Sequence, residues 1–150
     1  MERCEPRTPW PRLAPERGMP RLLLAEDDPD MRALLAQEFR SGGYRVTECV
    51  DGPDLVSKLG SYLLFGPPPA FDLVISDIQM PGATALEILA AMRECEGIPP
   101  VILITGFPSD DTRTAARQLG VAAVFDKPFE IADLVAKAED LLAPRLGEAP

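Results

Sequence analysis

The chain has 150 residues, 46% hydrophobic and 26% charged, which is typical of a single water-soluble folded domain. Its net charge of −9 argues against binding to bare nucleic acid, which requires Lys and Arg to neutralise phosphates, and the lack of His excludes His-based catalysis and His metal ligands. With no apolar run of membrane-spanning length and no apolar signal-peptide core, we expect a cytoplasmic protein that does not contact membranes.

Residues 1–20 differ in composition from the rest of the chain. They contain five Pro and four Arg, and their apolar residues show no periodicity. We interpret them as a disordered arm, with a partner-binding segment around Trp10 as the alternative. The folded domain is then predicted at 21–143, and a flexible tail at 144–150.

The first predicted strand covers 22–25 and is followed at once by three acidic residues. Asp28 precedes Pro29, which is typical of an N-cap and the first position of a helix. Glu26 and Asp27 lie before that cap, at the carboxyl end of the strand. Two adjacent acids repel each other there unless a cation or a base joins them.

The third predicted strand leads to the carboxylate of Asp77. A second strand at 46–50 and a helix containing Leu55 and Leu59 come first, and then an apolar run at 73–76 predicts a strand buried on both faces. A Met-Pro-Gly turn follows Asp77 closely. Asp77 is therefore expected at the carboxyl end of a central strand, although it could instead only cap the turn.

The rest of the chain continues the alternation of helices and strands. A helix is predicted at 83–95, and a strand at 101–104 ends on Thr105 and Gly106. The helix predicted at 109–119 has few large apolar residues, so we expect it to be lightly anchored. A strand at 122–125 precedes Lys127, and a final helix then begins near Ile131.

Five strands that alternate with five helices predict an α/β fold. For this chain length we expect a doubly wound, five-stranded parallel sheet with strand order 2-1-3-4-5, a flavodoxin-like (βα)5 arrangement. In that order the first and third strands are neighbours. Ligands bind at the carboxyl ends of the strands, where the strand order reverses.

This topology brings the three acids Glu26, Asp27 and Asp77 to the same rim of the sheet. Mg²⁺ prefers carboxylate and water oxygens together with a phosphate. The three carboxylates therefore predict a Mg²⁺ site.

Groups that suit an anion are predicted at the same rim. Lys127 supplies a point charge, and Thr105 supplies a hydroxyl. The backbone N–H groups of Gly106 and Gln79 add hydrogen-bond donors. A phosphoryl group beside a divalent cation fits this set, with Asp77 as the nucleophile.

The sequence resembles the receiver domain of two-component response regulators over about residues 20–143. Four segments carry the resemblance in the right order and spacing: Leu-Leu-Ala-Glu-Asp-Asp-Pro-Asp-Met-Arg (23–32), Asp-Leu-Val-Ile-Ser-Asp-Ile-Gln-Met-Pro-Gly (72–82), Val-Ile-Leu-Ile-Thr-Gly (101–106) and Lys-Pro-Phe (127–129).

The resemblance implies a role for each site residue. Asp77 would accept a phosphoryl group from a phosphohistidine on a histidine kinase or a phosphotransfer protein. The implied Mg²⁺ ligands are Asp27, Asp77, the carbonyl of Gln79 and, through water, Glu26. Lys127 and Thr105 would bind phosphoryl oxygens, and the Lys127–Pro128 peptide bond would be cis.

One position departs from the family pattern. Many members of the family have Tyr or Phe three residues before the Lys, with a ring that turns inward on activation, and this chain has Val124 there. Phe125 should point to the opposite face of its strand. Switching is therefore expected to use loop and helix displacement without that ring.

We hypothesise a stand-alone receiver, because only about seven residues follow the last predicted helix. Its output would be contact with an unknown downstream protein, and it would catalyse only its own phosphorylation and dephosphorylation. A pseudo-receiver adaptor that works without phosphate is the alternative. An aspartate-based phosphohydrolase would want an acid at Gln79, and a flavodoxin-type cofactor site would place phosphate against three acids.

Overall fold

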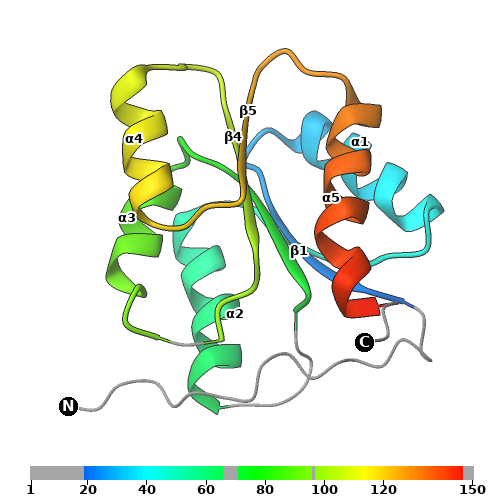
Figure 1. Cartoon of the computed structure of the whole chain (residues 1–150), viewed down its shortest axis with the longest axis horizontal. Helices are drawn as coiled ribbons and strands as arrows, with labels where there is room; N and C mark the ends of the chain where they lie inside the picture. The colour runs from blue at the N-terminus through cyan, green and yellow to red at the C-terminus, as the bar shows by residue number, and fades with distance from the viewer. Residues whose placement is uncertain (1–18, 66–70, 96, 147–150) are drawn as a thin grey trace.

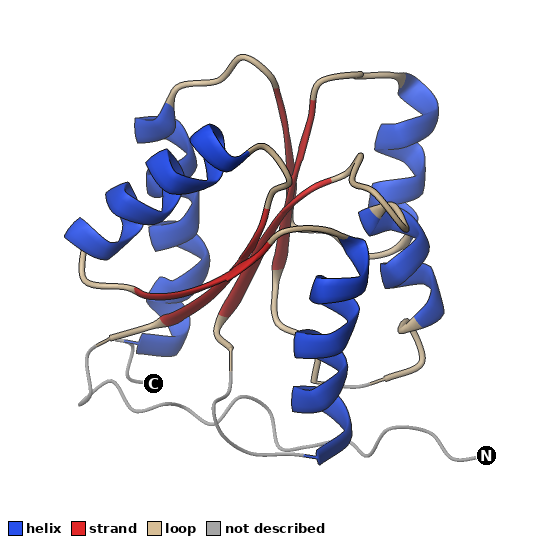
Figure 2. Ribbon diagram, turned by 180° about the vertical axis from the view of Figure 1, so that it is seen from behind, coloured by secondary structure: helices blue, strands red, loops and turns tan. Residues whose placement is uncertain are grey.

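The structure is a computed structural model that describes residues 19–65, 71–95 and 97–146. Its strands form one five-stranded parallel sheet with the order β2-β1-β3-β4-β5, which confirms the predicted topology. Figures 1 and 2 show this twisted sheet between two layers of helices. The strands are β1 (Arg21–Ala25), β2 (Arg45–Cys49), β3 (Leu73–Asp77), β4 (Val101–Thr105) and β5 (Ala123–Asp126).

Helices α1 and α5 cover one face of the sheet, and α2, α3 and α4 cover the other (Figure 1). All five residues of β3 and all five of β4 are buried, as expected for central strands that are apolar on both faces. The helices are α1 (Pro29–Ser41), α2 (Gly52–Phe65), α3 (Ala85–Ala91), α4 (Asp110–Gln118) and α5 (Ile131–Leu146).

Side-chain alternation along the strands divides the core in two. Leu23, Val74 and Leu103 pack under α2 and α3, whereas Leu22 and Ile75 pack under α1 and α5. The register aligns Ala25 with Ser76 and Asp77 with Ile104. The carboxyl ends of β1, β3 and β4 therefore meet at one rim of the sheet.

Asp28 caps α1 as predicted, and its carboxylate accepts hydrogen bonds from the N–H groups of Asp30 and Met31. The prediction for α3 was too long, since the helix is Ala85–Ala91 rather than 83–95. The Thr84 side chain and the Glu87 side chain each accept a hydrogen bond from the other's N–H, a capping box that fixes the start of α3.

Other boundaries differ by a few residues. β2 ends at Cys49, the last residue paired with β1, and Val50 is exposed beyond it. α5 continues to Leu146, past the predicted domain end at 143, and buries Leu142 near its end.

The predictions for residues 1–18 and 147–150 lie outside the described residues. No helix in the described part of the chain is both long and apolar enough to cross a membrane.

Candidate functional site

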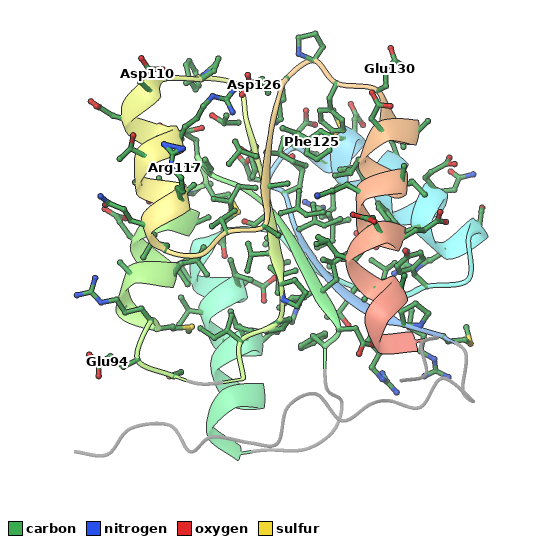
Figure 3. All side chains as sticks on the ribbon, in the orientation of Figure 1. Glu94, Asp110, Arg117, Phe125, Asp126 and Glu130 are labelled. Carbon is green, nitrogen blue, oxygen red and sulfur yellow. The ribbon has the colours of Figure 1, made fainter. Side chains whose placement is uncertain are left out.

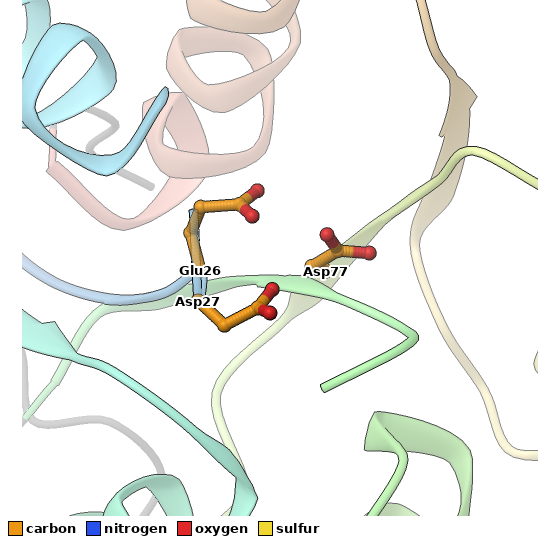
Figure 4. A group of neighbouring side chains, drawn as sticks. All are labelled: Glu26, Asp27 and Asp77. Atoms are coloured by element: carbon orange, nitrogen blue, oxygen red, sulfur yellow. The ribbon is translucent and has the colours of Figure 1, made fainter. Parts of the chain in front are cut away.

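Three carboxylates meet at the carboxyl ends of β1 and β3. Glu26 and Asp27 follow the last residue of β1, and Asp77 is the last residue of β3. One carboxylate oxygen from each lies within 4.8 Å of the other two, and Figure 4 shows the three groups around one space. Glu26 and Asp77 are buried, whereas Asp27 is exposed. The predicted convergence of these acids is confirmed.

Glu26 is the most deeply buried of the three acids, with 1% of its surface exposed. Its Oε2 accepts a hydrogen bond from the Asp28 N–H at 3.1 Å. Burial is the largest of the effects that raise the pKa of Glu26 to about 7, and the charge of Asp77 also acts to raise it. The hydrogen bond from Asp28 and the charge of Lys127 act in the opposite direction.

Lys127 reaches the acids from the end of β5. Its Nζ lies 2.8 Å from Asp77 Oδ2 and 3.4 Å from Glu26 Oε1. Burial lowers the pKa of Lys127, but the hydrogen bond and charge of Asp77, together with Glu26, outweigh it and raise that pKa overall. The ammonium therefore stays protonated beside Asp77. The Lys127–Pro128 peptide bond is cis, as the resemblance implied.

Thr105, fully buried at the end of β4, links the site to the β4–α4 loop. Its hydroxyl donates to Gln79 Oε1 at 3.3 Å and accepts from the Phe107 N–H at 2.9 Å. The Gln79 N–H in turn donates to Asp77 Oδ1 at 3.3 Å. Gly106 lies between these contacts, and a Cβ at this position would lie 3.8 Å from Lys127 Cδ.

The β3–α3 loop, which carries Gln79, is docked on the start of α2. The Gly52 N–H donates to the Pro81 carbonyl at 3.0 Å. A Cβ on Gly52 would lie 2.6 Å from the Ala83 oxygen, and a Cβ on Gly82 would lie 2.5 Å from Pro53 Cδ. The two glycines therefore permit a close backbone approach that positions the loop beside Asp77.

This donor set fits Mg²⁺, because three carboxylates within reach of one ion supply hard oxygen ligands. The burial of Glu26 and Asp77 supports the fit, since buried acids this close repel one another unless cations balance them. Lys127 supplies one positive charge, which does not balance three carboxylates.

The sequence profile of the response regulator receiver domain matches residues 22–139. The chain belongs to the response regulator receiver domain family. This receiver is 38% identical over 123 residues to the transcriptional activator protein PfeR of Pseudomonas aeruginosa, a match that covers 82% of this chain and 38% of PfeR. It is 32% identical over 124 residues to the response regulator receiver protein CpdR of Brucella abortus, covering 83% of this chain and 98% of CpdR.

Solved structures share the fold of this receiver. The response regulator TrrA from Thermotoga maritima, solved in complex with Mg²⁺-BeF, is 29% identical with a TM-score of 0.69, and the match covers 83% of this chain and all of TrrA. A CheY-like receiver from Methanospirillum hungatei gives a TM-score of 0.74 at 22% identity, covering 85% of this chain and 96% of that protein. Of the two relatives compared by sequence above, the receiver spans less than half of the length of PfeR and nearly all of the length of CpdR.

β5 lies one residue later than the predicted strand at 122–125, but the predicted opposite orientations of Val124 and Phe125 are confirmed. Val124 is partly buried against the core under α2 and α3, whereas Phe125 is partly buried against the core on the α1 and α5 side. Figure 3 shows Phe125 on the α5 side of the strand and Asp126 on the α4 side. The place that an aromatic ring takes in many members of the family is therefore held by Val124, and Phe125 does not replace that ring.

Two contacts at the rim escaped the sequence prediction. The side chain of Gln79, predicted to act through its backbone, accepts from the Thr105 hydroxyl. Arg32 donates to the carbonyl oxygen of Glu26. Arg32 falls within the segment that carries the family resemblance, but its spacing alone does not reveal a contact with a strand end.

Proposed function

We propose that this receiver is a phosphorylation-dependent signalling switch that accepts a phosphoryl group on Asp77 from a phosphohistidine. The observation that carries the proposal is a buried aspartate at the carboxyl end of β3, 2.8 Å from a lysine ammonium and grouped with two further acids. The donor is a histidine kinase or a phosphotransfer protein, and the output is contact with a downstream protein.

In the proposed transfer, a carboxylate oxygen of Asp77 attacks the phosphorus of the phosphohistidine. The O–P bond forms as the N–P bond breaks, and the imidazole nitrogen keeps the electron pair of the broken bond. The product is an acyl phosphate on Asp77. Hydrolysis by water then restores the carboxylate, so the receiver catalyses only its own phosphorylation and dephosphorylation.

Positioning and charge neutralisation account for most of the catalysis in such a transfer. Asp27, Asp77 and the Gln79 carbonyl would hold Mg²⁺ directly, with Glu26 acting through water. When bound, the ion would neutralise charge on the phosphoryl oxygens. Lys127 would neutralise the opposite side, and the N–H groups of Gly106 and Gln79 would donate to the remaining oxygens.

The proposed switch starts at Thr105. Its hydroxyl would turn from Gln79 toward the phosphoryl group on Asp77. Since that hydroxyl also accepts the Phe107 N–H, the β4–α4 loop would move with it. α4 follows directly in the chain and is anchored by few buried side chains, so we expect it to shift as well.

We also propose a cellular location and a class of partner for this receiver. We place the receiver in the cytoplasm, where it would meet its kinase, with no membrane contact. We expect no direct contact with nucleic acid because the net charge of −9 opposes binding to phosphates. The kinase-facing and target-facing contacts would both be with proteins.

The intact protein mass after incubation with a small phosphodonor tests the proposal. With Mg²⁺, wild-type protein should gain one phosphoryl group, and Asp77→Asn protein or wild type in EDTA should gain none. If folded wild-type protein gains nothing from a phosphodonor or from any phosphorylated kinase tried, the phosphate-independent adaptor replaces the proposal.

A further inference from the structure

Arg32, on the first turns of α1, contacts the backbone of the acidic pair that follows β1. Its Nη1 donates to the carbonyl oxygen of Glu26 at 2.8 Å. The side chain is 18% exposed, so most of the guanidinium group is held against the protein. This is a directed contact to one carbonyl and not a general surface charge.

The carbonyl that Arg32 holds belongs to the peptide unit between Glu26 and Asp27. That unit is planar, so its orientation sets how the Cα atoms of the two acids are turned relative to each other. The other side of Glu26 is fixed as well, because its N–H donates to the Cys49 carbonyl at 3.1 Å. Arg32 thus completes the restraint on the backbone that presents both acids.

Arg32 is itself held in place by Glu48 on β2. Its Nε lies 3.2 Å from Glu48 Oε1, and Arg40 Nη1 lies 3.0 Å from Glu48 Oε2. Both oxygens of Glu48 are therefore engaged, and the guanidinium fork of Arg32 spans from β2 to the end of β1. Lys cannot reproduce a planar fork with two fixed donor directions.

We infer that Arg32 is a positioning residue for the Mg²⁺ site, acting through the Glu26–Asp27 peptide unit rather than as a ligand. The inference rests on the proposed function, because it presumes that Glu26 and Asp27 help to hold Mg²⁺. Groups that orient metal ligands typically change metal affinity by about 10- to 100-fold when they are removed. The lower end applies here, since Arg32 orients the backbone and not a ligand atom directly.

The sign of the effect separates positioning from simple electrostatics. Arg32 is a cation near an acidic cluster, and removal of a cation on its own strengthens the attraction of the cluster for Mg²⁺. Loss of positioning has the opposite effect, because the two acids are then free to adopt orientations that do not suit the ion. Arg32→Met keeps the bulk of the side-chain stem and removes both the charge and the hydrogen-bond donors. The two explanations therefore predict opposite changes in the Mg²⁺ affinity of this variant.

The test is the dissociation constant for Mg²⁺, measured on the full chain by isothermal titration calorimetry with magnesium chloride. We expect Arg32→Met to bind Mg²⁺ about tenfold more weakly than wild type. Arg32→Lys, which keeps the charge but not the fork, should also bind more weakly. It serves as the second variant if Arg32→Met does not fold.

Arg40→Met is the matched control. Arg40 pairs with the same Glu48 and donates to a backbone carbonyl, that of Val46 at 2.9 Å, but it does not contact Glu26. Its variant should bind Mg²⁺ like wild type. Thermal unfolding in EDTA, measured on all variants, reports separately any loss of stability that the two substitutions share.

Unchanged or tighter Mg²⁺ binding by Arg32→Met overturns the inference, as does equal weakening by Arg32→Met and Arg40→Met. In both cases, Mg²⁺ binding by the wild-type protein would show that the Mg²⁺ site of the proposed function holds even though the inference about Arg32 is wrong. If wild type itself binds no Mg²⁺, the proposed function fails and the inference about Arg32 fails with it.

Discussion

At the scale of single residues, the site consists of buried charges that compensate one another only in part. Glu26 and Asp77 are buried, and Lys127 is the cation that contacts both within the described residues. Removal of one partner from such a group leaves the other charges desolvated and unpaired. Lys127 should therefore contribute to the stability of the metal-free protein as well as to phosphorylation.

Lys127→Met should lower the free energy of unfolding in EDTA by about 1–3 kcal/mol. Urea unfolding followed by circular dichroism measures the change. Lys137→Met is the control, because Lys137 pairs only loosely with Asp140, at 3.8 Å on the surface, and its loss should change stability little. A Lys127→Met protein as stable as the control would show that the acids do not need this cation.

Asp54, near the start of α2, gives a stability contribution that depends on pH. The hydrogen bond from the Val50 N–H, at 3.0 Å, lowers the pKa of Asp54, and Lys58 at 3.1 Å adds to the effect. A lowered folded-state pKa stabilises the fold above the unfolded-state pKa, near 3.8, and this stabilisation is lost as the pH falls through the folded-state value.

Asp54→Asn should therefore be less stable than wild type at pH 7, by on the order of 1 kcal/mol, the difference between a hydrogen bond to a charged group and one to a neutral group. The difference should shrink as the pH falls below 4. Urea unfolding of both proteins across this pH range measures it. A difference that stayed constant with pH would mean that the carboxylate charge is not the source of the stability.

Residue contacts were predictable from sequence only where topology dictates them. The acids that follow β1 and end β3 had to meet once the strand order was known. The Gln79–Thr105 hydrogen bond and the Arg32–Glu26 contact depend on side-chain conformations and on the path of a loop. Neither is determined by the periodicity of apolar residues.

At the scale of elements, the β3–α3 loop is positioned by glycine contacts with the start of α2. Gly82 has φ +93° and a Cβ there would meet Pro53 Cδ at 2.5 Å, whereas Gly43 has φ +96° with nothing within 4 Å of its Cβ position. Substitution of either glycine by Ala would strain the backbone, because both have positive φ. Only at Gly82 would the added Cβ also clash with a neighbour.

Gly82→Ala should therefore destabilise the protein by more than Gly43→Ala, which should cost about 1–2 kcal/mol. Gly82→Ala should also slow phosphorylation of Asp77, because the displaced loop carries Gln79. Thermal unfolding and phosphorylation rates of both variants test this. Equal effects of the two substitutions would show that the contact with Pro53 is unimportant.

The second element that matters is α4. It buries only Ala116 among its described side chains, and Arg113 forms an ion pair with Asp126 at the end of β5. Figure 3 shows Asp126 between α4 and the sheet. Asp126 pairs in register with Thr105 and precedes Lys127, so this ion pair connects α4 to the ends of β4 and β5 at the phosphoryl site.

Arg113→Ala should therefore increase amide hydrogen exchange in α4 of the unphosphorylated protein by a few fold, as expected for loss of one partly exposed ion pair. Hydrogen exchange with mass spectrometry measures it. Arg117→Ala is the control, since Arg117 lies one turn further on and, within the described residues, hydrogen-bonds only to the Thr114 hydroxyl, at 3.5 Å. The same exchange rate in both variants would rule out a restraining role for the ion pair.

Element boundaries were predicted less well than the elements themselves. The sequence pattern placed α3 at 83–95, because apolar spacing does not register the capping box that starts the helix at Ala85. The end of α3 at Ala91 is also set by local contacts that apolar spacing does not reveal. Such ends depend on individual hydrogen bonds, whereas the existence of each element depends on a repeated pattern.

At the scale of the whole molecule, the strand order explains why the site exists. Residues from the ends of β1, β3, β4 and β5 are far apart in sequence, and Lys127 follows Glu26 by 101 positions. The parallel sheet brings all of them to one rim. The alternation of strands and helices predicted this arrangement because a parallel sheet with connections on both faces has few alternative orders at this length.

The proposed switch depends on Asp77 as the residue that carries the phosphoryl group. The most direct measurement is reduction of the phosphorylated protein with borohydride, which converts an acyl phosphate to an alcohol, followed by peptide mass spectrometry. We expect position 77 alone to be converted to homoserine, and only after incubation with phosphodonor and Mg²⁺. Conversion at Asp27 or Glu26, with Asp77 unmodified in folded protein, would contradict it.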